Sequence, residues 1–360
     1  MRPIASRALG LARALKGRDA PARALAIADS RRFVRACFLS SAMRTGLLGL
    51  MRGGCTFSDL ALKSGSARSD RLEAWLAIGV ELGELAQRGD RYVVVGRRAR
   101  ALADGNALLT AHYRSMLEYQ VGPYADLSDL LGSRPGEGRD DLGLHARTIA
   151  EVSLAAAPFI VPFLRTTVSE TRPGRALDVG CGTGVYLRAL LDADPLIRVE
   201  GIELAQEVAS ETAARLLADG LSDRAEVHTG DVRDWELTSG RAFDLITLCN
   251  NVYYFGRDER VALYRRLGGL LARDGRLLVT TMTWPGSTAS AHLHFMLCCQ
   301  AGSAGLPQDG EIEADLALAG FEVLDSQRLV PTEPFFGITA RRLATQGATP
   351  VSQKRRSPSP

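Results

Sequence analysis

The stretch Ala176–Gly184 constrains the fold of this chain more than any other. It reads Ala-Leu-Asp-Val-Gly-Cys-Gly-Thr-Gly, an apolar run that ends in an acid and is followed by glycines at alternate positions. Glycine is needed where the backbone must adopt conformations closed to other residues, or where a ligand must approach the main chain. The pattern predicts a buried parallel strand that turns sharply into a helix. At the carboxyl end of such a strand in an open α/β sheet, the usual ligand is a nucleotide or a related molecule.

The spacing of the glycines separates two kinds of cofactor. Dinucleotide-binding loops follow the pattern G-x-G-x-x-G, which would place the third glycine at position 185, where this chain has Val185. The chain instead has Asp178-x-Gly180-x-Gly182-x-Gly184. This spacing resembles the first motif of class I S-adenosylmethionine (SAM) methyltransferases. The resemblance implies that the loop backbone runs beside the methionine part of SAM and that Asp178 helps to hold its ammonium group.

Two further acids extend this resemblance. The segment Arg198–Glu203 reads as a second strand, and Glu203 lies 19 residues after the last glycine of the loop. Nucleotide-binding α/β folds place a carboxylate there on ribose hydroxyls, and a carboxylate can accept both hydroxyl protons. A third strand at 225–229 is followed by Asp231 and Val232. In the family this acid accepts from the adenine amino group and the next residue packs beside the ring; a plain turn cap is the alternative for Asp231.

Strand and helix patterns alternate from residue 175 to 342, which predicts an α/β fold with a Rossmann-like sheet of seven strands. The stretch 243–249 is almost continuously apolar, as a central parallel strand should be. Residues 272–275 predict a turn into a strand at 276–281. The segment 321–342 predicts a closing antiparallel hairpin.

The part of the chain before the sheet reads as a mostly helical, winged-helix domain. Apolar residues at helical spacing predict a helix over 22–50 that a glycine at 46 interrupts. A capping-box-like start predicts a short helix at 57–63. Ser69 is expected to cap a longer helix through Leu82, and a hairpin follows at 85–95.

Two interpretations of this winged-helix module are open. A helix that reads DNA needs Arg, Lys, Asn or Gln on its outer face, whereas residues 69–84 present Arg71 against four acids, which phosphates would repel. The acids are Asp70, Glu73, Glu81 and Glu84. The module resembles the N-terminal dimerisation domain of small-molecule O-methyltransferases, which implies a homodimer. We therefore expect no nucleic-acid partner, and a SAM-responsive DNA-binding regulator is the alternative.

The chain is predicted to have five segments. They are a basic N-terminal segment at 1–21, a winged-helix-like dimerisation domain at 22–105, bridging helices at 106–170, a SAM-binding methyltransferase domain at 171–342 and a disordered tail at 343–360. In the family the bridging helices line the acceptor pocket. Core packing explains their aromatic and apolar residues equally well; these are Tyr113, Met116, Tyr119, Tyr124 and Phe159.

The composition is that of a soluble globular protein, with 46% hydrophobic and 24% charged residues. No apolar run approaches the ~20 residues of a membrane span. The six cysteines are scattered without a CxxC pair, so neither a zinc site nor a disulfide framework is predicted, and a reducing cytoplasm is the expected location. The net charge of +3 is concentrated near the N-terminus. A plain surface helix explains that basic segment better than a mitochondrial presequence or a membrane-binding helix does.

The residues expected to act on the acceptor depart from the resembled family. Plant-like and polyketide O-methyltransferases carry a histidine just after the fourth strand, and this chain has Tyr254 there. A neutral tyrosine with a pKa near 10 is a poor base at neutral pH. Tyr254 would orient the acceptor, pack beside the sulfonium or only line the pocket. Asn250 is expected to reach the cofactor and Asn251 the acceptor.

Two histidines offer a replacement for the missing base. His292 and His294 lie in the segment 287–300, which forms much of the acceptor pocket in the family. Two residues apart on a helix, they point in different directions and cannot both face the methyl group or share a metal, so no metal is expected. For each of them, packing within a helix is the alternative.

The sequence therefore predicts SAM-dependent methyl transfer to a small-molecule acceptor. O-methylation of an aromatic or polyketide-like metabolite is the first choice. N- or C-methylation without a histidine base is an alternative, because an amine can attack unassisted. Use of bound SAM for structure or for other chemistry is another alternative.

Overall fold

The chain divides into two compact units in the computed structural model, which describes residues 18–65, 67–134, 137–235 and 242–343. The N-terminal unit comprises the chain up to residue 133 together with 141–155. The second unit, here called the sheet unit, comprises 134–140 and the chain from residue 156 onward. Most of the predicted basic segment at 1–21 and nearly all of the predicted tail at 343–360 lie outside the described residues.

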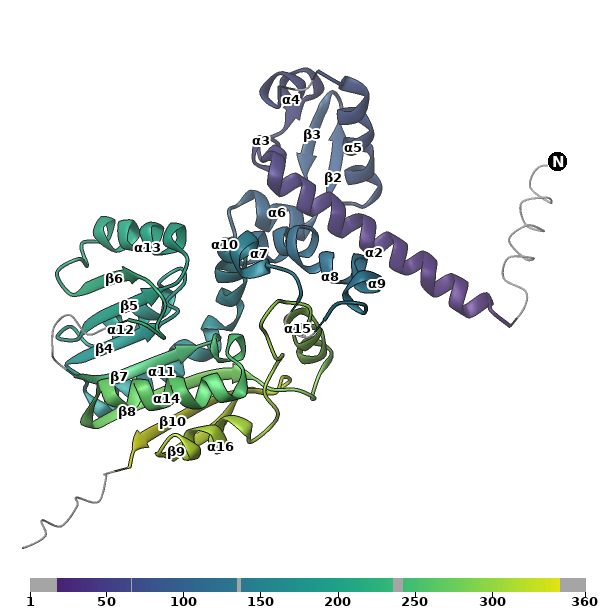
Figure 1. Cartoon of the computed structure of the whole chain (residues 1–360). Helices are drawn as coiled ribbons and strands as arrows, with labels where there is room; N and C mark the ends of the chain where they lie inside the picture. The colour runs from purple at the N-terminus through teal and green to yellow at the C-terminus, as the bar shows by residue number, and fades with distance from the viewer. Residues whose placement is uncertain (1–17, 66, 135–136, 236–241, 344–360) are drawn as a thin grey trace, which may run out of the picture. The chain divides into compact units, whose positions relative to one another are not determined.

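The N-terminal unit follows the element order expected of a winged helix (Figure 1). Its first elements are α2 (Ala20–Thr45), α3 (Leu47–Leu50), β1 (Cys55–Thr56), α4 (Phe57–Lys63), α5 (Ser69–Glu81), β2 (Leu85–Arg88) and β3 (Arg91–Val94). Gly46 ends α2 in the left-handed conformation, with φ of 66°. The Thr56 hydroxyl caps α4 by accepting the Asp59 N–H at 3.2 Å. The three strands form one antiparallel sheet in the order β1-β3-β2.

Two expectations about α5 are wrong. Ser69 is the first residue of the helix rather than its cap, and Arg68 holds the N-cap position. Glu84 is not on the outer face, because its side chain is buried and ion-paired with two arginines, Arg35 at 3.3 Å and Arg98 at 3.5 Å. A buried carboxylate is stable only when it is paired. Glu84 therefore ties α2 to the helix that contains Arg98.

The predicted bridging stretches are divided into shorter helices. These are α6 (Arg97–Ala103), α7 (Ala107–Ser115), a π-helix (Met116–Gln120), α8 (Gly122–Ala125), α9 (Leu127–Leu130), α10 (Asp141–Ser153), a 3₁₀ turn (Leu154–Ala156) and α11 (Ala157–Thr171). Pro158 lies in the first turn of α11, where the missing N–H costs no helical hydrogen bond, whereas Pro162 lies inside it. The break between α10 and α11 coincides with the boundary between the two units.

One helical stretch, Gly143–Thr171, is long and apolar enough to cross a membrane by length and composition alone. The expectation that no segment approaches such a span is therefore too strict. Within the sheet unit, the apolar face of α11 packs into the core through Ile160, Phe163 and Leu164. A core helix of a soluble protein passes the same test of length and composition, so the stretch is weak support for a membrane span.

The sheet unit contains a seven-stranded mixed sheet, as predicted. Its strands are β4 (Arg175–Val179), β5 (Arg198–Glu203), β6 (Ala225–Thr229), β7 (Phe243–Cys249), β8 (Leu271–Met282), β9 (Phe321–Val330) and β10 (Phe335–Arg342). The order across the sheet is β6-β5-β4-β7-β8-β10-β9. The first five of these strands pair in parallel, and β10 pairs antiparallel with both β8 and β9. The chain reverses its direction of progress between β4 and β7, which is where open α/β sheets bind ligands.

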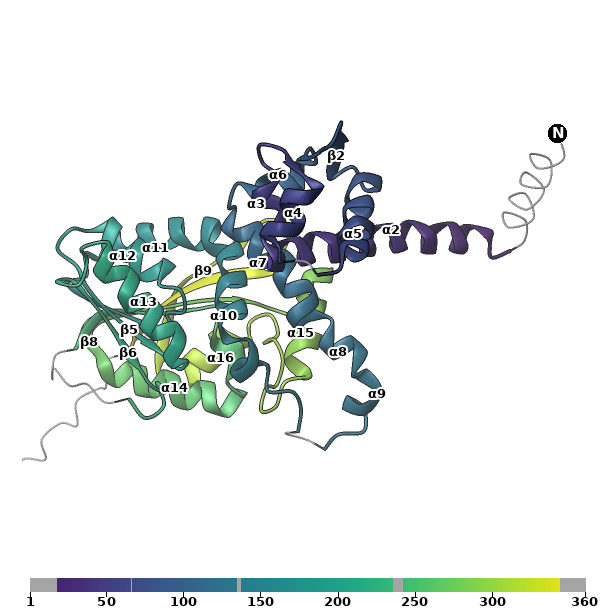
Figure 2. The ribbon, with the colours of Figure 1, turned by 90° about the horizontal axis from the view of Figure 1, so that it is seen from above.

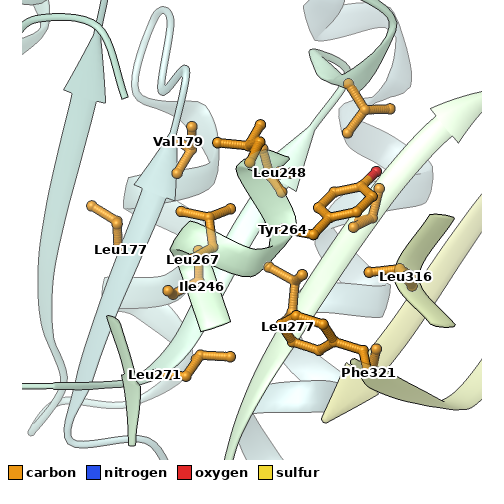
Figure 3. Close-up of a cluster of buried hydrophobic side chains, with 14 of the residues drawn as sticks. Leu177, Val179, Ile246, Leu248, Tyr264, Leu267, Leu271, Leu277, Leu316 and Phe321 are labelled. Atoms are coloured by element: carbon orange, nitrogen blue, oxygen red, sulfur yellow. The ribbon is translucent and has the colours of Figure 1, made fainter. Parts of the chain in front are cut away.

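Helices cover both faces of this sheet (Figure 2). They include α12 (Val185–Ala193), α13 (Gln206–Ala218), α14 (Arg257–Leu270) and α16 (Glu311–Leu318), whereas α15 (Thr288–Cys298) packs with residues that follow β7 and β8. One buried cluster joins α11 and α12 to one face. A second cluster joins α14 and α16 to the other face, with Tyr264, Leu267 and Leu316 fully buried (Figure 3). The two clusters fix the sheet as a rigid platform for its loops.

The strand β8 begins earlier than predicted. Leu271 pairs with Phe243 and Arg276 pairs with Leu245, so residues 272–275 bulge out within a continuous strand rather than preceding it. A Cβ added at Gly275 would lie 2.9 Å from the Phe243 carbonyl oxygen. The missing side chain allows the bulge to pass close to β7.

Candidate functional site

The glycine loop between β4 and α12 has a backbone that other residues resist. Gly180, Gly182 and Gly184 have φ of 66°, 51° and 78°, in the left-handed region. A Cβ added at Gly180 would lie 2.6 Å from Asn251 Nδ2, and one added at Gly184 would lie 2.6 Å from Thr212 Cγ2. The loop is therefore a closely packed backbone surface at the carboxyl end of β4.

Glu203, at the end of β5, holds the glycine loop and the start of α13. Its Oε2 accepts the Gly182 N–H at 2.9 Å and its Oε1 accepts the Ala205 N–H at 3.0 Å. Each carboxylate oxygen has two lone pairs, so each keeps one for a further donor. The carboxylate is thus positioned by the backbone and still able to accept hydroxyl protons.

Asp178, the last acid of β4, is almost completely buried. Its Oδ1 accepts from the Thr247 hydroxyl at 2.6 Å, and its Oδ2 has no hydrogen-bond partner among the described residues. Burial raises the pKa of Asp178 to about 7; the Glu203 charge adds to the rise, and the Thr247 hydrogen bond opposes it. An unpartnered buried carboxylate oxygen is costly unless a donor or a cation completes it.

Asp231 and Val232 follow β6 as predicted. Val232 is buried in the core cluster of β4 and β7. Asp231 is partly exposed and pairs with Arg233 at 2.6 Å. This ion pair and its hydrogen bonds lower the pKa of Asp231 below its usual range. Asp178, Glu203 and Asp231 thus end or follow three neighbouring strands. With the three glycines they are called the cofactor edge below.

The two asparagines after β7 have different orientations. Asn250 adopts a left-handed φ of 59°, uncommon for a residue with a side chain, and donates its backbone N–H to the Thr280 carbonyl at 3.0 Å. Asn251 donates its side-chain amide to the Val179 carbonyl, and its buried Oδ1 has no partner among the described residues. Asn251 is therefore directed at the glycine loop, whereas the sequence analysis expects it at the acceptor.

Tyr254 lies in a group of apolar and aromatic side chains at the carboxyl ends of β7 and β8. This group, here called the aromatic cluster, comprises Tyr253, Tyr254, Met282, Trp284, Leu293, Leu297 and Leu306. The Tyr253 and Tyr254 rings meet edge to face, with centroids 4.8 Å apart. Tyr253, Leu297 and Leu306 are buried, and the other members are partly buried.

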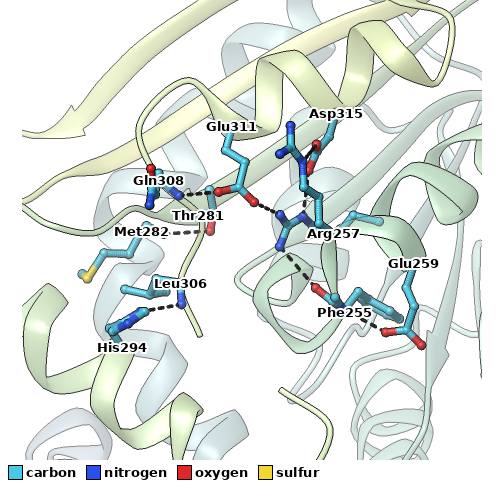
Figure 4. A network of polar contacts seen from close by, with 12 residues as sticks. Phe255, Arg257, Glu259, Thr281, Met282, His294, Leu306, Gln308, Glu311 and Asp315 are labelled. Carbon is cyan, nitrogen blue, oxygen red and sulfur yellow. Dashed lines mark hydrogen bonds and ion pairs between the residues drawn. The ribbon is translucent and has the colours of Figure 1, made fainter. Parts of the chain in front are cut away.

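The two histidines of α15 differ in their surroundings, and Figure 4 shows the contact of His294 with Leu306. His294 Nδ1 accepts the Leu306 N–H at 3.0 Å, and its ring stacks on Trp284 with centroids 4.3 Å apart. His294 Nε2 lies 3.5 Å from Cys298 Sγ. Because Nδ1 is an acceptor, the proton of the neutral ring is on Nε2, so neither nitrogen is available as a base. Burial lowers the pKa of both His292 and His294, which keeps them neutral.

A buried charge network behind the aromatic cluster is absent from the sequence predictions. Arg260 donates to Asp315 at 3.0 Å, to the Phe255 carbonyl at 3.2 Å and to Glu311. Arg260 and Asp315 are both buried. The network borders a cavity of about 160 Å³ lined by Arg257, Arg260, Trp284, His294, Ala304, Gly305, Leu306, Gln308 and Glu311. No spacing pattern marks such a pair, because its partners lie on separate helices.

The remaining polar candidates have structural surroundings. His228 lies on β6, 3.3 Å from Glu200. In the N-terminal unit, His112 contacts Tyr113 and His145 contacts Tyr119 through their rings. All six cysteines are free thiols. No group of three His, Cys, Asp or Glu side chains that could hold a metal occurs among the described residues.

The topology and the cofactor edge together define the class I methyltransferase architecture. A likeness in fold supports this: an O-methyltransferase family protein from Burkholderia thailandensis superposes with a TM-score of 0.71 over 88% of this chain and 96% of that one, at 19% identity. At this identity the likeness concerns the fold alone.

Sequence comparisons add evidence for the enzyme type. Residues 176–275 match the family model described as a methyltransferase domain. Demethylspheroidene O-methyltransferase of Cereibacter sphaeroides is 26% identical over 265 residues, 69% of this chain and 67% of that protein. An N,N-dimethyltransferase of dTDP-3-amino-3,6-dideoxy-alpha-D-glucopyranose from Streptomyces fradiae is 33% identical over 111 residues, 30% of this chain and 40% of that protein. The methyltransferase domain at 176–275 and these methyltransferase relatives show that the chain is a SAM-dependent methyltransferase.

The residues present fit SAM. The buried Oδ2 of Asp178 has no hydrogen-bond partner among the described residues, and side chains at Gly180 or Gly184 would collide with Asn251 and Thr212. An ammonium group can donate a hydrogen bond to such an oxygen and pair with its charge. A backbone surface without side chains allows close approach of a ligand.

Proposed function

We propose that this enzyme methylates an oxygen of a small aromatic or polyketide-like acceptor. The observation that carries the proposal is the aromatic cluster at the carboxyl ends of β7 and β8, beside the cofactor edge. Flat apolar rings bind to such side chains by burial and stacking. The O-methyltransferase name of the Cereibacter sphaeroides relative also favours oxygen as the acceptor atom.

The cofactor edge would hold SAM by three acids and the loop backbone. The unpartnered Asp178 oxygen would accept from the ammonium group, and the remaining lone pairs of Glu203 would accept from the ribose hydroxyls. Asp231 would accept from the adenine amino group, with Val232 beside the ring. Asn250 would reach the methionine part from its left-handed turn. Bound SAM supplies an activated methyl group, so the chain mainly has to align the nucleophile, which can contribute ~7–11 kcal/mol.

Both nitrogens of His294 are engaged, which disfavours it as a base, and His292 is the other histidine candidate. A positioned base contributes ~10²–10⁴-fold. Tyr254 would orient the acceptor from within the aromatic cluster.

N-methylation is the second candidate function. It is favoured by Tyr254, which replaces the family histidine, and by the engaged nitrogens of His294. A neutral amine has a lone pair ready for attack and needs no proton removed first.

The test is transfer of a labelled methyl group from SAM by the purified full chain to a panel of phenols and matched aromatic amines. Label on phenolic oxygen supports the first proposal, and label on nitrogen alone supports the second. SAM binding without transfer to any phenol, amine or metabolite extract would contradict both, and would point to structural use of the cofactor.

We also propose that two chains pair through the N-terminal unit. Apolar residues of α2 that a single chain leaves exposed support this, with Leu25 at 66%, Ile27 at 73% and Phe33 at 61% exposure. Beside them, α2 and α5 form a groove of about 370 Å³ lined by Arg31, Val34, Ala77, Ile78, Glu81 and Leu82. A second copy of the chain would cover this surface. We expect the pair to form in a reducing cytoplasm.

Sedimentation of the purified protein tests the pairing. Ile27→Glu with Phe33→Glu should convert a dimer into a monomer, whereas Leu196→Glu, at an equally exposed site of the sheet unit, should not. A wild-type monomer, or a dimer that survives the double change, would contradict the proposal.

A further inference from the structure

Arg233 follows Asp231 by two residues, and its N–H groups contact both oxygens of the Asp231 carboxylate. The Arg233 backbone N–H donates to Asp231 Oδ1 at 2.8 Å, and its Nε lies 3.0 Å from Oδ1 and 2.9 Å from Oδ2. Its Nη2 donates to Oδ2 at 2.6 Å. A carboxylate has about four lone-pair sites. These four contacts come from three N–H groups, because the single Nε–H is shared by both oxygens, and together they take up most of the acceptor capacity of Asp231.

The adenine role proposed for Asp231 needs a lone pair on a carboxylate that Arg233 already contacts through three N–H groups. An adenine amino group would therefore compete with Arg233 for Asp231, and release of the guanidinium would free lone pairs on both oxygens. The Arg233 side chain is 52% exposed and can move, whereas Asp231, at 23% exposure, is held within the loop.

A second carboxylate, that of Glu259, also lies within reach of Arg233. The Arg233 Nη1 is 3.4 Å from Glu259 Oε1, and the Arg233 guanidinium carbon is 5.9 Å from the centroid of the Phe255 ring. Glu259 uses its other oxygen, Oε2, to cap α14 by accepting the Gly256 N–H at 2.9 Å. Oε1 can thus take a full ion pair without loss of the cap.

We propose that Arg233 is a latch on the adenine subsite, which leaves Asp231 for Glu259 when adenine binds. This inference rests on the adenine role proposed for Asp231. In the released position the guanidinium joins the start of α14 and the Phe255 ring, one residue after Tyr254. Arg233 thereby acts as a positioning residue that links the adenine subsite to the turn carrying Tyr254.

Calorimetric titration of the full chain with S-adenosylhomocysteine, which has the adenine and amino-acid parts of SAM, tests the latch. Arg233→Gln should tighten binding about two- to five-fold at low salt, the range expected from releasing an exposed ion pair. The gain should vanish near 1 M salt, where the screening length is about 3 Å. Arg188→Gln is the matched control, because Arg188 pairs with Asp192 and Asp219 at similar exposure, outside the proposed site.

The receiving carboxylate is tested by a double-mutant cycle. Glu259→Gln keeps a cap oxygen and should weaken binding in the wild-type background, but should have no effect beside Arg233→Gln. Equal effects in both backgrounds would overturn the transfer to Glu259. Unchanged or weakened binding by Arg233→Gln at low salt would overturn the latch itself. Unchanged binding by Asp231→Ala, which removes the acceptor oxygens, would instead show that the adenine assignment is wrong.

Discussion

The cofactor edge and the aromatic cluster lie at the same end of one sheet but are built from different groups. At the cofactor edge the main chain makes the shape: Glu203 accepts two backbone N–H groups, and the Thr212 hydroxyl donates to the Gly182 carbonyl at 2.7 Å. In the aromatic cluster, side chains from β7, β8, α15 and the following loop pack on one another. One site is made of backbone and the other of side-chain volume.

This difference decides how far a family resemblance extends. A backbone-built site needs glycine at fixed positions and acids at strand ends, so its ligand can be recognised from residue spacing. A pocket built from side-chain volume accepts many combinations of apolar residues. The methyl donor therefore follows from the family, while the acceptor depends on residues particular to this chain.

The largest expected effect is at Gly180. A Cβ there would lie 2.6 Å from Asn251 Nδ2 on a backbone with φ of 66°, so Gly180→Ala combines strain of about 1–2 kcal/mol with displacement of Asn251. We expect S-adenosylhomocysteine to bind roughly 100-fold more weakly by calorimetry, about 2.7 kcal/mol.

A glycine outside the site provides the control for this change. A Cβ added at Gly269, in α14, meets no atom within 4 Å. Gly269→Ala should leave binding unchanged and stabilise the fold by about 0.5–1 kcal/mol. If Gly180→Ala binds as the wild type does, the glycine loop is not the backbone surface that approaches the cofactor.

Substitutions of the two histidines of α15 are expected to have smaller effects that differ from each other. His294→Ala leaves the Leu306 N–H without its acceptor, so we expect a loss of about 1–3 kcal/mol in the free energy of unfolding, measured by urea titration. The shape of its pH–rate profile should stay that of the wild type. His292→Ala should lose turnover and change the shape of the pH–rate profile if His292 is the base.

The opposite pattern would reverse these roles. A stable His294→Ala variant with a flattened pH–rate profile would assign the base to His294. If neither change alters the profile, proton removal by these histidines is ruled out, and the N-methylation proposal gains support.

Much of the fold could be predicted because local chemistry specifies it. The Thr56 cap, the Gly46 stop and the acids at the ends of β4 and β5 each depend on neighbours within a few residues. The Ser69 cap failed because the residue before it, Arg68, takes the cap position. The bulge at 272–275 was missed because its register depends on pairing with β7, which is distant in sequence.

The site was only partly predictable for the same reason. The positions of Asp178, Glu203 and Asp231 follow from strand order, but the ion pair of Asp231 with Arg233 depends on a side-chain orientation. The engaged nitrogens of His294 depend on Leu306, 12 residues away. The Arg260–Asp315 pair joins helices 55 residues apart in sequence. No local pattern contains such contacts.

The contact proposed between Asp178 and the ammonium group of SAM is central, because it places the amino-acid part of SAM at this edge of the sheet. The Asp178 pKa of about 7 in the fold lies above the ordinary pKa of an aspartate, about 3.9, so its ionisation costs folding free energy that grows as pH rises from about 4 to 7. Asp178→Asn removes that cost. Without cofactor, the variant should be more stable by roughly 2 kcal/mol above pH 7, or about 4–8 °C in Tm.

Calorimetry with S-adenosylhomocysteine at pH 6, 7 and 8 tests the claim most directly. The ammonium group requires an ionised Asp178, so the wild type should bind several-fold to about tenfold more tightly at pH 8 than at pH 6. Asp178→Asn should bind roughly 100-fold more weakly, with no such rise. Equal affinity of the variant and the wild type across this range would contradict the account.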